Sequence, residues 1–282
     1  MRSPALVAGG LVLLALSGAV ALASPQANAP TVPQASAVAL NDASSWPVPR
    51  MPKATPTPTA TPTPAPTPHP AVAATAPAQL TGQFTFPVPV RAQTMNLDCE
   101  TAALQMALMA MGHSYSQSEL FSLEKPDTRA PIIDRGPPKR VIQWGDPYTN
   151  FVGNVNGADL IPTGYGVYWP VILSIAQSHG APNSYGHEGF SAAEIYAAVR
   201  AGHPVEAWTE TGWDRPYVGY WTAWDGRQIR YSLIEHTVIL SGVSANSVRV
   251  NDPWRGGSQY WISKAKFEVS WRDFNNMAIV FQ

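Results

Sequence analysis

The sequence predicts an α+β fold, with helices early in the folded part of the chain and an antiparallel sheet after them. Two capping-box patterns, Ser116-Gln-Ser-Glu119 and Ser191-Ala-Ala-Glu194, predict helix starts before Gly202. After Gly202 the sequence changes to short runs of β-branched and aromatic residues separated by tight turns, which is typical of antiparallel strands. Helices first and a sheet second favour the α+β class.

The first 23 residues have the features of an export signal. Arg2 provides a short positive region, residues 5–22 carry no charge, and Ala21-Leu-Ala23 is a small-residue cleavage site. We therefore expect a signal peptide at residues 1–23, a secreted or cell-surface protein, and no membrane association after cleavage. The alternative is an uncleaved anchor, because the apolar run is close to the length that spans a bilayer.

Residues 24–82 are predicted to be a disordered, proline-rich linker. Between Pro52 and Ala78 the chain is almost entirely proline, threonine and alanine, a composition that cannot bury enough apolar surface to fold. It favours an extended polyproline II spacer, which at about 3.1 Å per residue would reach roughly 80 Å. A disordered tail without a task is the alternative, and the threonines are candidate glycosylation sites.

Residues 83–282 are predicted to form one folded domain. It opens at residues 83–90 with an extended edge segment, because the prolines there cannot donate hydrogen bonds within a central strand. A helix from residue 98 or 99 follows and stops at Gly112. Its buried stripe comprises Ala103, Leu104, Ala107, Leu108 and Met111.

Residues 130–170 are rich in glycine, proline, tyrosine and tryptophan, and they show little periodicity. A stretch of this length is usually either disordered or functional, and its aromatic content argues against disorder. We therefore expect ordered loops that line a cleft. The candidate substrate contacts are Trp144, Tyr148, Tyr165, Tyr168 and Trp169. The alternative is that these rings form a small separate core beneath the loops.

The predicted sheet is assembled from short strands after Gly202. Residues 205–209, 217–224 and 228–233 come first, with a turn at Asp225-Gly226. Two apolar, β-branched runs then flank Ser244-Ala-Asn-Ser247 and predict a hairpin. Residues 258–262 and 277–281 complete the sheet, around a short helix at residues 264–271.

Cys99 is the only cysteine of the chain and lies at the predicted start of the first helix. An exported structural cysteine needs a disulfide partner, and this chain offers none, which leaves a free thiol, an intermolecular bond or a nucleophile. The unpaired N–H groups and partial positive charge of a helix N-terminus favour the thiolate, the form that attacks carbonyl groups. The alternative is a buried cysteine that packs as a small hydrophobic residue.

His236 and Asp252 are the candidate partners of Cys99. Each lies eight positions from Ser244, and in a hairpin centred there residues equidistant from the turn face each other. A carboxylate beside the imidazole fixes its tautomer and leaves the other nitrogen free to take the thiol proton. The three residues outline a Cys-His-Asp triad. Taken singly, His236 fits a half-exposed strand residue and Asp252 a turn former before Pro253.

Further motifs accompany these three residues. Gln93 precedes Cys99 by six residues, Glu235-His-Thr-Val238 forms the strand and Val250-Asn-Asp-Pro253 the turn. Three more segments, at residues 145–153, 163–168 and 202–208, belong to the same set. Over residues 84–282 the set resembles papain-like cysteine peptidases of the bacteriocin-leader (double-glycine leader) processing type, in their stand-alone exported form.

The resemblance implies a papain-like fold with the nucleophile on an early helix and the histidine and aspartate on a later sheet. It implies Cys99 as nucleophile, His236 as general base and acid, Asp252 as the orienting acid, and Gln93 as a side-chain donor to the oxyanion. One departure is visible, because Glu100-Thr101 stands where this family commonly has Gly-Pro. A carboxylate in the first turn suits the helix dipole but opposes thiolate formation.

Composition and missing motifs argue against several other functions. A net charge of −1 disfavours nucleic acids and anionic membranes as partners, since both require a basic excess. His179, His187 and His203 lack the spacing of zinc ligands, so we expect no metal. The sequence has no phosphate-binding glycine loop and no Gly-x-Ser-x-Gly motif, and we expect no cofactor.

The sequence therefore predicts an exported thiol hydrolase, a monomer that acts on a peptide or protein substrate through an acyl-enzyme on Cys99. One alternative keeps this chemistry and changes the substrate, as in a peptidoglycan endopeptidase acting on cell-wall peptide or a transglutaminase-like acyl transferase. The other is a peptide-binding module that keeps the fold without turnover, for which Glu100 is the motivating residue.

Overall fold

The computed structural model describes residues 82–136, 140–213 and 218–282. The predicted signal peptide and residues 24–81 of the predicted linker lie outside the described residues, so both stay predictions. In the part of the chain that is described, no helix is both long enough and apolar enough to cross a membrane.

An antiparallel sheet of seven strands lies at the centre of the described domain. Its order is β10-β9-β8-β5-β11-β4, and β1 pairs with the end of β8. The strands are β1 (Phe84–Thr85), β4 (Tyr185–His187), β5 (Val205–Glu210), β8 (Glu235–Val243), β9 (Ser247–Asp252), β10 (Ser258–Ser263) and β11 (Ala278–Val280). Together with the helices this confirms the predicted α+β class.

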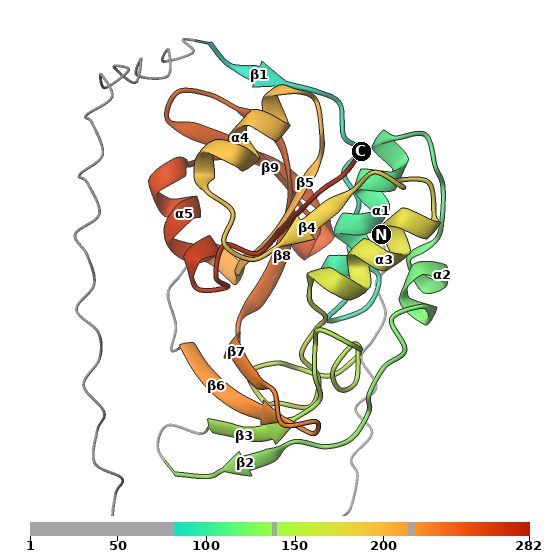
Figure 1. Ribbon diagram of the computed structural model, residues 1–282, viewed down its shortest axis with the longest axis vertical. Coiled ribbons are helices and arrows are strands. Elements are labelled where there is room, and N and C mark those ends of the chain that lie inside the picture. Colours follow the sequence, from blue (N-terminus) through green and yellow to red (C-terminus); the bar gives the residue numbers. More distant parts are fainter. Residues whose placement is uncertain (1–81, 137–139, 214–217) are drawn as a thin grey trace, which may run out of the picture. The chain divides into compact units, whose positions relative to one another are not determined.

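Helices cover both faces of this sheet (Figure 1). On one side lie α1 (Cys99–Ala110), α2 (Gln117–Ser122) and α3 (Trp169–Ser178), and on the other α4 (Ala192–Arg200) and α5 (Lys264–Arg272). Alternating residues of the strands supply the two cores. On β8, Ile239 packs in the cluster beside α1 and α3, while Val238 and Leu240 pack in the cluster beside α4 and α5.

The helix α1 begins at Cys99 and is buried on nearly all sides. Alanine, leucine and methionine fill it, and Ala102, Ala103 and Leu104 are fully buried in succession. The sequence predicted a buried stripe, but a helix that is apolar around its circumference belongs inside a core. It packs against β8 and β5, so the first residue of α1 faces the strand that carries His236.

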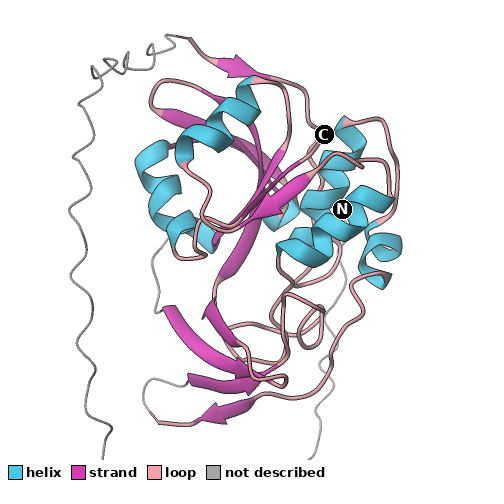
Figure 2. Ribbon diagram, in the orientation of Figure 1, coloured by secondary structure: helices cyan, strands magenta, loops and turns pink. Residues whose placement is uncertain are grey.

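A second, smaller sheet differs from the prediction of one continuous sheet (Figure 2). It has the order β2-β3-β6-β7, from β2 (Ile132–Asp134), β3 (Arg140–Trp144), β6 (Val218–Ala223) and β7 (Gln228–Ser232). The hairpin β6-β7 pairs with β3 because Trp221 and Tyr231 pack there against Trp144 and Tyr165. Residues expected to form only loops thus provide two of these strands.

Most helix boundaries follow the predicted capping. Ser116 and Ser191 each form a capping box, and Gly112 and Gly202 have positive φ angles of 90° and 89° just after their helices. The helix α3 was missed. Its start has no side-chain cap, and its remaining signal is a proline in the first turn, which glycine-rich surroundings obscured.

Candidate active site

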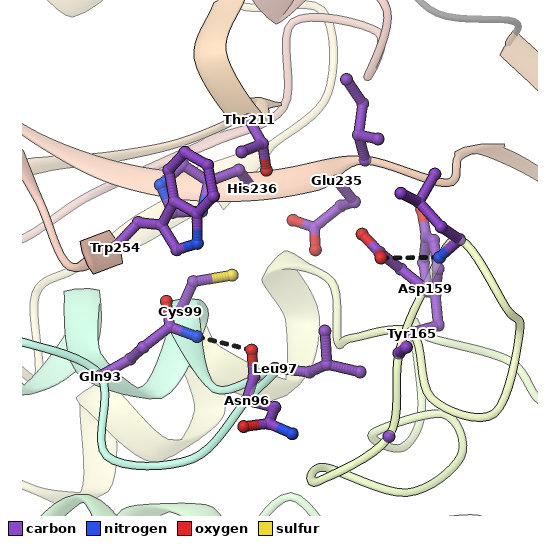
Figure 3. Close-up of a pocket in the computed structure, with 14 residues that line it drawn as sticks. Gln93, Asn96, Leu97, Cys99, Asp159, Tyr165, Thr211, Glu235, His236 and Trp254 are labelled. Atoms are coloured by element: carbon purple, nitrogen blue, oxygen red, sulfur yellow. Dashed lines mark hydrogen bonds between the residues drawn. The ribbon is translucent and has the colours of Figure 1, made fainter.

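Cys99 lies in a pocket of about 430 Å³. Residues 93–99, 157–165 and 234–236 contribute most of the lining, together with Thr211 and Trp254 (Figure 3). The pocket therefore joins the start of α1, a glycine-containing loop and the first residues of β8. Cys99, His236 and Gln93 all line it, so three of the four predicted site residues meet there and Asp252 stands behind His236.

The segment before Cys99 is anchored by side chains of the first two helices. The Gln117 amide oxygen accepts hydrogen bonds from both the backbone N–H and the hydroxyl of Thr94, each at 2.8 Å. Its amide nitrogen donates to the Ala92 carbonyl and to Gln105. Asp98 accepts a hydrogen bond from the Met95 N–H. These contacts fix the segment that precedes Cys99 and so position the cysteine. Sequence reasoning did not identify Gln117.

His236 and Asp252 form a hydrogen bond of 2.8 Å between Nε2 and Oδ1. The predicted contact is present, but the register that suggested it is wrong. Strands β8 and β9 pair Ile239 with Asn251 and Leu240 with Val250, with an irregularity between Leu240 and Gly242. Continued to the end of β9, this register sets Asp252 opposite Val238, so His236 is its diagonal neighbour on the same face.

Asp252 is held as a carboxylate. Burial disfavours its charge, but hydrogen bonds from His236, the Tyr260 hydroxyl (2.7 Å) and the Trp254 N–H (2.9 Å) outweigh burial and lower its pKa. Tyr260 in turn accepts a hydrogen bond from Trp213. Tyr260 is a functional candidate that sequence reasoning missed. The available signal was its position on the predicted strand of residues 258–262, where it pairs with Val250 of the neighbouring strand, two residues before Asp252.

Cys99 is surrounded by acids on its other side. Its thiol donates to Glu100 Oε2 at 3.3 Å, and one atom each of Cys99, Glu100 and Glu235 lie within 4.8 Å of one another. Burial is the largest cause of a thiol pKa well above the usual range, and both carboxylates add to it, partly opposed by the Thr237 N–H. The helix N-terminus therefore does not produce a thiolate in this arrangement.

The two carboxyl groups of this acidic side are themselves buried. Burial raises the pKa of Glu100 to about 7, although the Val167 N–H donates to its Oε1 at 2.7 Å. Burial and the neighbouring Glu100 raise the pKa of Glu235, which accepts a hydrogen bond from Thr237 at 3.1 Å. Gly166 lies directly behind both, and a Cβ there would come within 2.9 Å of Glu235 Oε2.

Deeper acids extend this cluster. Burial and the charge of Glu100 raise the pKa of both Glu206 and Glu124. Glu124 accepts a hydrogen bond from Thr101, whereas neither carboxyl oxygen of Glu206 has a hydrogen-bond partner among the described residues. Burial beside other acids favours the neutral, protonated form of a carboxyl group.

Gln93 lies beside Cys99, but its amide is engaged elsewhere. Its Nε2 donates to the carbonyl oxygens of Met95 (3.1 Å) and Asn96 (2.7 Å), and its Oε1 is buried without a hydrogen-bond partner in the described structure. Both amide hydrogens are thus used. Donation to an oxyanion requires exchange of one of these two bonds, so the predicted role of Gln93 stays a prediction.

The five aromatic residues expected to contact substrate separate into two groups. Tyr165 lines the pocket. Trp144 and Tyr168 are 0% and 1% exposed within the core, and Trp169 packs against the same core. Tyr148 is partly buried and donates to Glu188, away from the pocket lining. These four rings therefore belong to the main core shared with α1 and β8, and not to a small separate core beneath the loops.

A metal ion would find ligands only at the acidic side of Cys99 among the described residues. Cys99, Glu100 and Glu235 form the group close enough to share a cation. His179, His187 and His203 take no part in such a group. Soft thiolate and hard carboxylate ligands together suit zinc.

Papain-like architecture is therefore present, with a cysteine at the start of a buried helix and a His-Asp pair on an antiparallel sheet. The profile of the Peptidase_C39-like family matches residues 85–279. The chain belongs to this family, which confirms the predicted resemblance.

Three known proteins are similar to parts of this chain. The uncharacterized protein YvpB of Bacillus subtilis (strain 168) is 26% identical over 187 residues, which are 65% of this chain and 68% of YvpB. A crystal structure from Bacillus anthracis, classed as a C39-like peptidase, has a TM-score of 0.60 and 26% identity over 71% of this chain and 98% of its own. A double-glycine motif protease of an AMS/PCAT transporter, solved with its leader peptide, has 16% identity, a TM-score of 0.40, and coverage of 70% and 92%.

Proposed function

We propose that this protein is an exported cysteine peptidase that cleaves peptide bonds through Cys99, His236 and Asp252. One observation carries the proposal: the hydrogen bond from His236 Nε2 to a carboxylate that three donors keep ionised. It fixes the imidazole so that Nδ1 is the nitrogen left for the thiol in the same pocket. Membership of the Peptidase_C39-like family supports it.

The proposed reaction starts with transfer of the Cys99 proton to His236 Nδ1. The thiolate attacks the substrate carbonyl, and the developing oxyanion is stabilised by N–H groups at the start of α1, which have no acceptor within the helix. Gln93 contributes after releasing Met95 or Asn96. His236 then protonates the leaving amine, and the same nitrogen activates the water that hydrolyses the thioester.

The thiol must leave Glu100 before it can react. In the structure the thiol donates to Glu100, and both burial and the carboxylates oppose its ionisation. Entry of a substrate would have to break this contact and turn the thiol toward His236. The same contact favours a second candidate, a peptide-binding module that retains the fold without turnover.

An active-site-directed epoxide distinguishes the two candidates. We expect the mature protein to be labelled at Cys99, with the His236→Ala variant labelled more slowly, and to cleave members of a peptide library. Peptide binding without labelling or cleavage would support the binding module.

Further experiments test the substrate class. Parallel digestion of purified cell wall separates a general peptidase from an endopeptidase of cell-wall peptide. With a transglutaminase-like enzyme, an added amine would capture the acyl group as an amide product. Cell fractionation tests export.

A further inference from the structure

The part of the pocket beside Cys99 carries two carboxyl groups from different segments. Glu235 is the first residue of β8, and Asp159 lies in the loop of residues 157–165. Figure 3 shows the Glu235 carboxyl group directed toward the Cys99 sulfur and the Asp159 carboxyl group directed toward Glu235. The described lining contains no lysine or arginine, so His236 is its basic side chain.

Glu235 has an unused acceptor in this space. Its side chain is 6% exposed, and its Oε1 accepts the Thr237 hydroxyl at 3.1 Å. Its Oε2 takes part in no hydrogen bond with the described residues, yet it lines the pocket. Unlike the two carboxyl oxygens of Glu206, Glu235 Oε2 is not fully buried, so a hydrogen-bond donor in the pocket can reach it.

Asp159 is the second acceptor. Its Oδ1 accepts the Leu160 N–H at 2.7 Å, which positions the carboxyl group and leaves Oδ2 for a ligand. Glu235 and Asp159 are close enough for Asp159 to raise the pKa of Glu235, after larger contributions from burial and Glu100. Burial also raises the pKa of Asp159, and a cation between the two carboxyl groups would favour their ionised forms, both of which attract it.

The remaining walls of this part of the pocket are apolar. Leu97, Ala158, Tyr165 and Ile234 line it, and Leu160 at the rim is 66% exposed. Apolar walls that lead to two carboxyl groups match an aliphatic stem that ends in a cation, as in a lysine or arginine side chain.

We propose that this pocket is a specificity pocket for a basic side chain of the substrate next to the scissile bond, with Glu235 and Asp159 binding its cationic end. The inference rests on the proposed peptidase function and names its substrate class. Because one atom of Glu235 lies within 4.8 Å of one of Cys99, the bound cation adjoins the reacting sulfur.

Matched peptides test the proposal in the mature protein. Peptides with lysine, arginine, norleucine, glutamine or glutamate beside the cleaved bond are compared by kcat/KM. We expect lysine or arginine to exceed norleucine by at least about tenfold, as a charge-assisted contact provides. In Glu235→Gln and Asp159→Asn the ratio of lysine to norleucine should fall toward one. Asp134→Asn, an exposed carboxylate on β2, is the matched control and should keep the wild-type ratio.

A second measurement does not require turnover. Alkylation of Cys99 by iodoacetamide is followed with 1-aminopentane or with 1-pentanol, which has the same stem and no charge. The amine should protect Cys99 and the alcohol should not, and Asp159→Asn should lose the protection. Asp159 lies in a loop, so this variant keeps the test usable if Glu235→Gln unfolds.

The outcomes separate the pocket from the chemistry. Protection by the amine without cleavage of any peptide would refute the peptidase and keep the cation pocket. Cleavage with equal rates for lysine, norleucine and glutamate peptides would overturn the pocket and keep the peptidase. Protection by micromolar Zn²⁺ but not by the amine would also overturn it, because the carboxyl groups would then serve a metal ion.

Discussion

The two sides of Cys99 carry the same chemical group in opposite states. On the His236 side, Asp252 receives hydrogen bonds from an imidazole, a phenol and a backbone N–H, and its pKa is lowered in spite of burial. On the other side, Glu100 also accepts hydrogen bonds, from the Val167 N–H and the Cys99 thiol, but burial outweighs them, and the pKa values of Glu100 and Glu235 are raised. Burial alone therefore does not determine the charge of an active-site acid. The neighbouring histidine favours the carboxylate of Asp252, whereas neighbouring acids disfavour the carboxylates of Glu100 and Glu235.

His236→Ala should have the largest effect, because it removes the base and the cation that Asp252 supports. We expect kcat/KM at neutral pH to fall by about 1000-fold or more. Alkylation of Cys99 should also slow, since the thiolate loses its cationic partner. Circular dichroism controls for folding. Activity close to wild type would assign the base to another residue.

The Asp252 variants should have the next largest effect, and they test the His236 side of Cys99 directly. Asp252→Ala should lower kcat/KM by roughly 100-fold or more. Asp252→Asn should be less severe, since an amide oxygen still accepts the hydrogen bond from His236. The pH profiles of kcat/KM are measured for both variants and for Tyr260→Phe, which removes one hydrogen-bond donor to Asp252. If Asp252→Ala turns over like wild type while His236→Ala is inactive, the pair does not act as a unit.

Gln93→Ala tests the oxyanion donor. Its effect on kcat/KM should be similar to that of Asp252→Ala or smaller. Loss of one donor typically reduces the rate by on the order of 100-fold, while Cys99 still reacts with small alkylating agents. Single-turnover kinetics and alkylation are measured side by side. A parallel fall in both would indicate misfolding, because the Gln93 amide also holds the carbonyls of Met95 and Asn96.

Glu100→Gln should have the smallest effect on turnover and a distinct effect on pH dependence. The pKa of Glu100 rises from 4.5 to about 7 on folding, so its stabilising contribution is complete below 4.5 and is lost as the pH rises through 7. The wild-type melting temperature should therefore be higher at about pH 5 than at about pH 8, and Glu100→Gln should narrow the difference. Asp252 has a lowered pKa, so its contribution to stability is present at neutral pH and is lost as the pH falls.

The same variant reports on the thiol. Without the Glu100 carboxylate, Cys99 should be alkylated several-fold faster at about pH 8. Asp134→Asn serves again as the control. An unchanged rate would mean that burial alone, and not the acidic side, sets the reactivity of Cys99.

The sequence predicted the local features best. The start of α1, both capping boxes, the late helix and most strands follow from short patterns. The predicted hairpin also forms and brings His236 and Asp252 into contact, although in a register that differs from the predicted one. What the sequence did not predict depends on tertiary packing. The bulge before Gly242 shifts the register, and the pairing of β3 with β6 joins segments far apart in the chain. Neither has a local signal.

The site shows the same division. Cys99 and Glu100 are adjacent in sequence, so their mutual influence was expected. Glu235, Glu206 and Glu124 come from three separate segments of the chain, and only the fold brings them near Glu100. The aromatic residues of 130–170 could not be assigned from composition, because a ring that lines a pocket and a ring that fills a core have the same sequence signature.

A substitution at Gly166 would change the positions of Glu100 and Glu235 without changing any charge. Its missing side chain is the space in which the carboxyl groups of Glu100 and Glu235 lie, and a single methyl group there would collide with both. A methyl group would force the two carboxyl groups to move, while every ionisable group of the chain remains. The spacing of the pair, and with it the width of the space beside Cys99, is thus set by a residue that contributes no side chain at all.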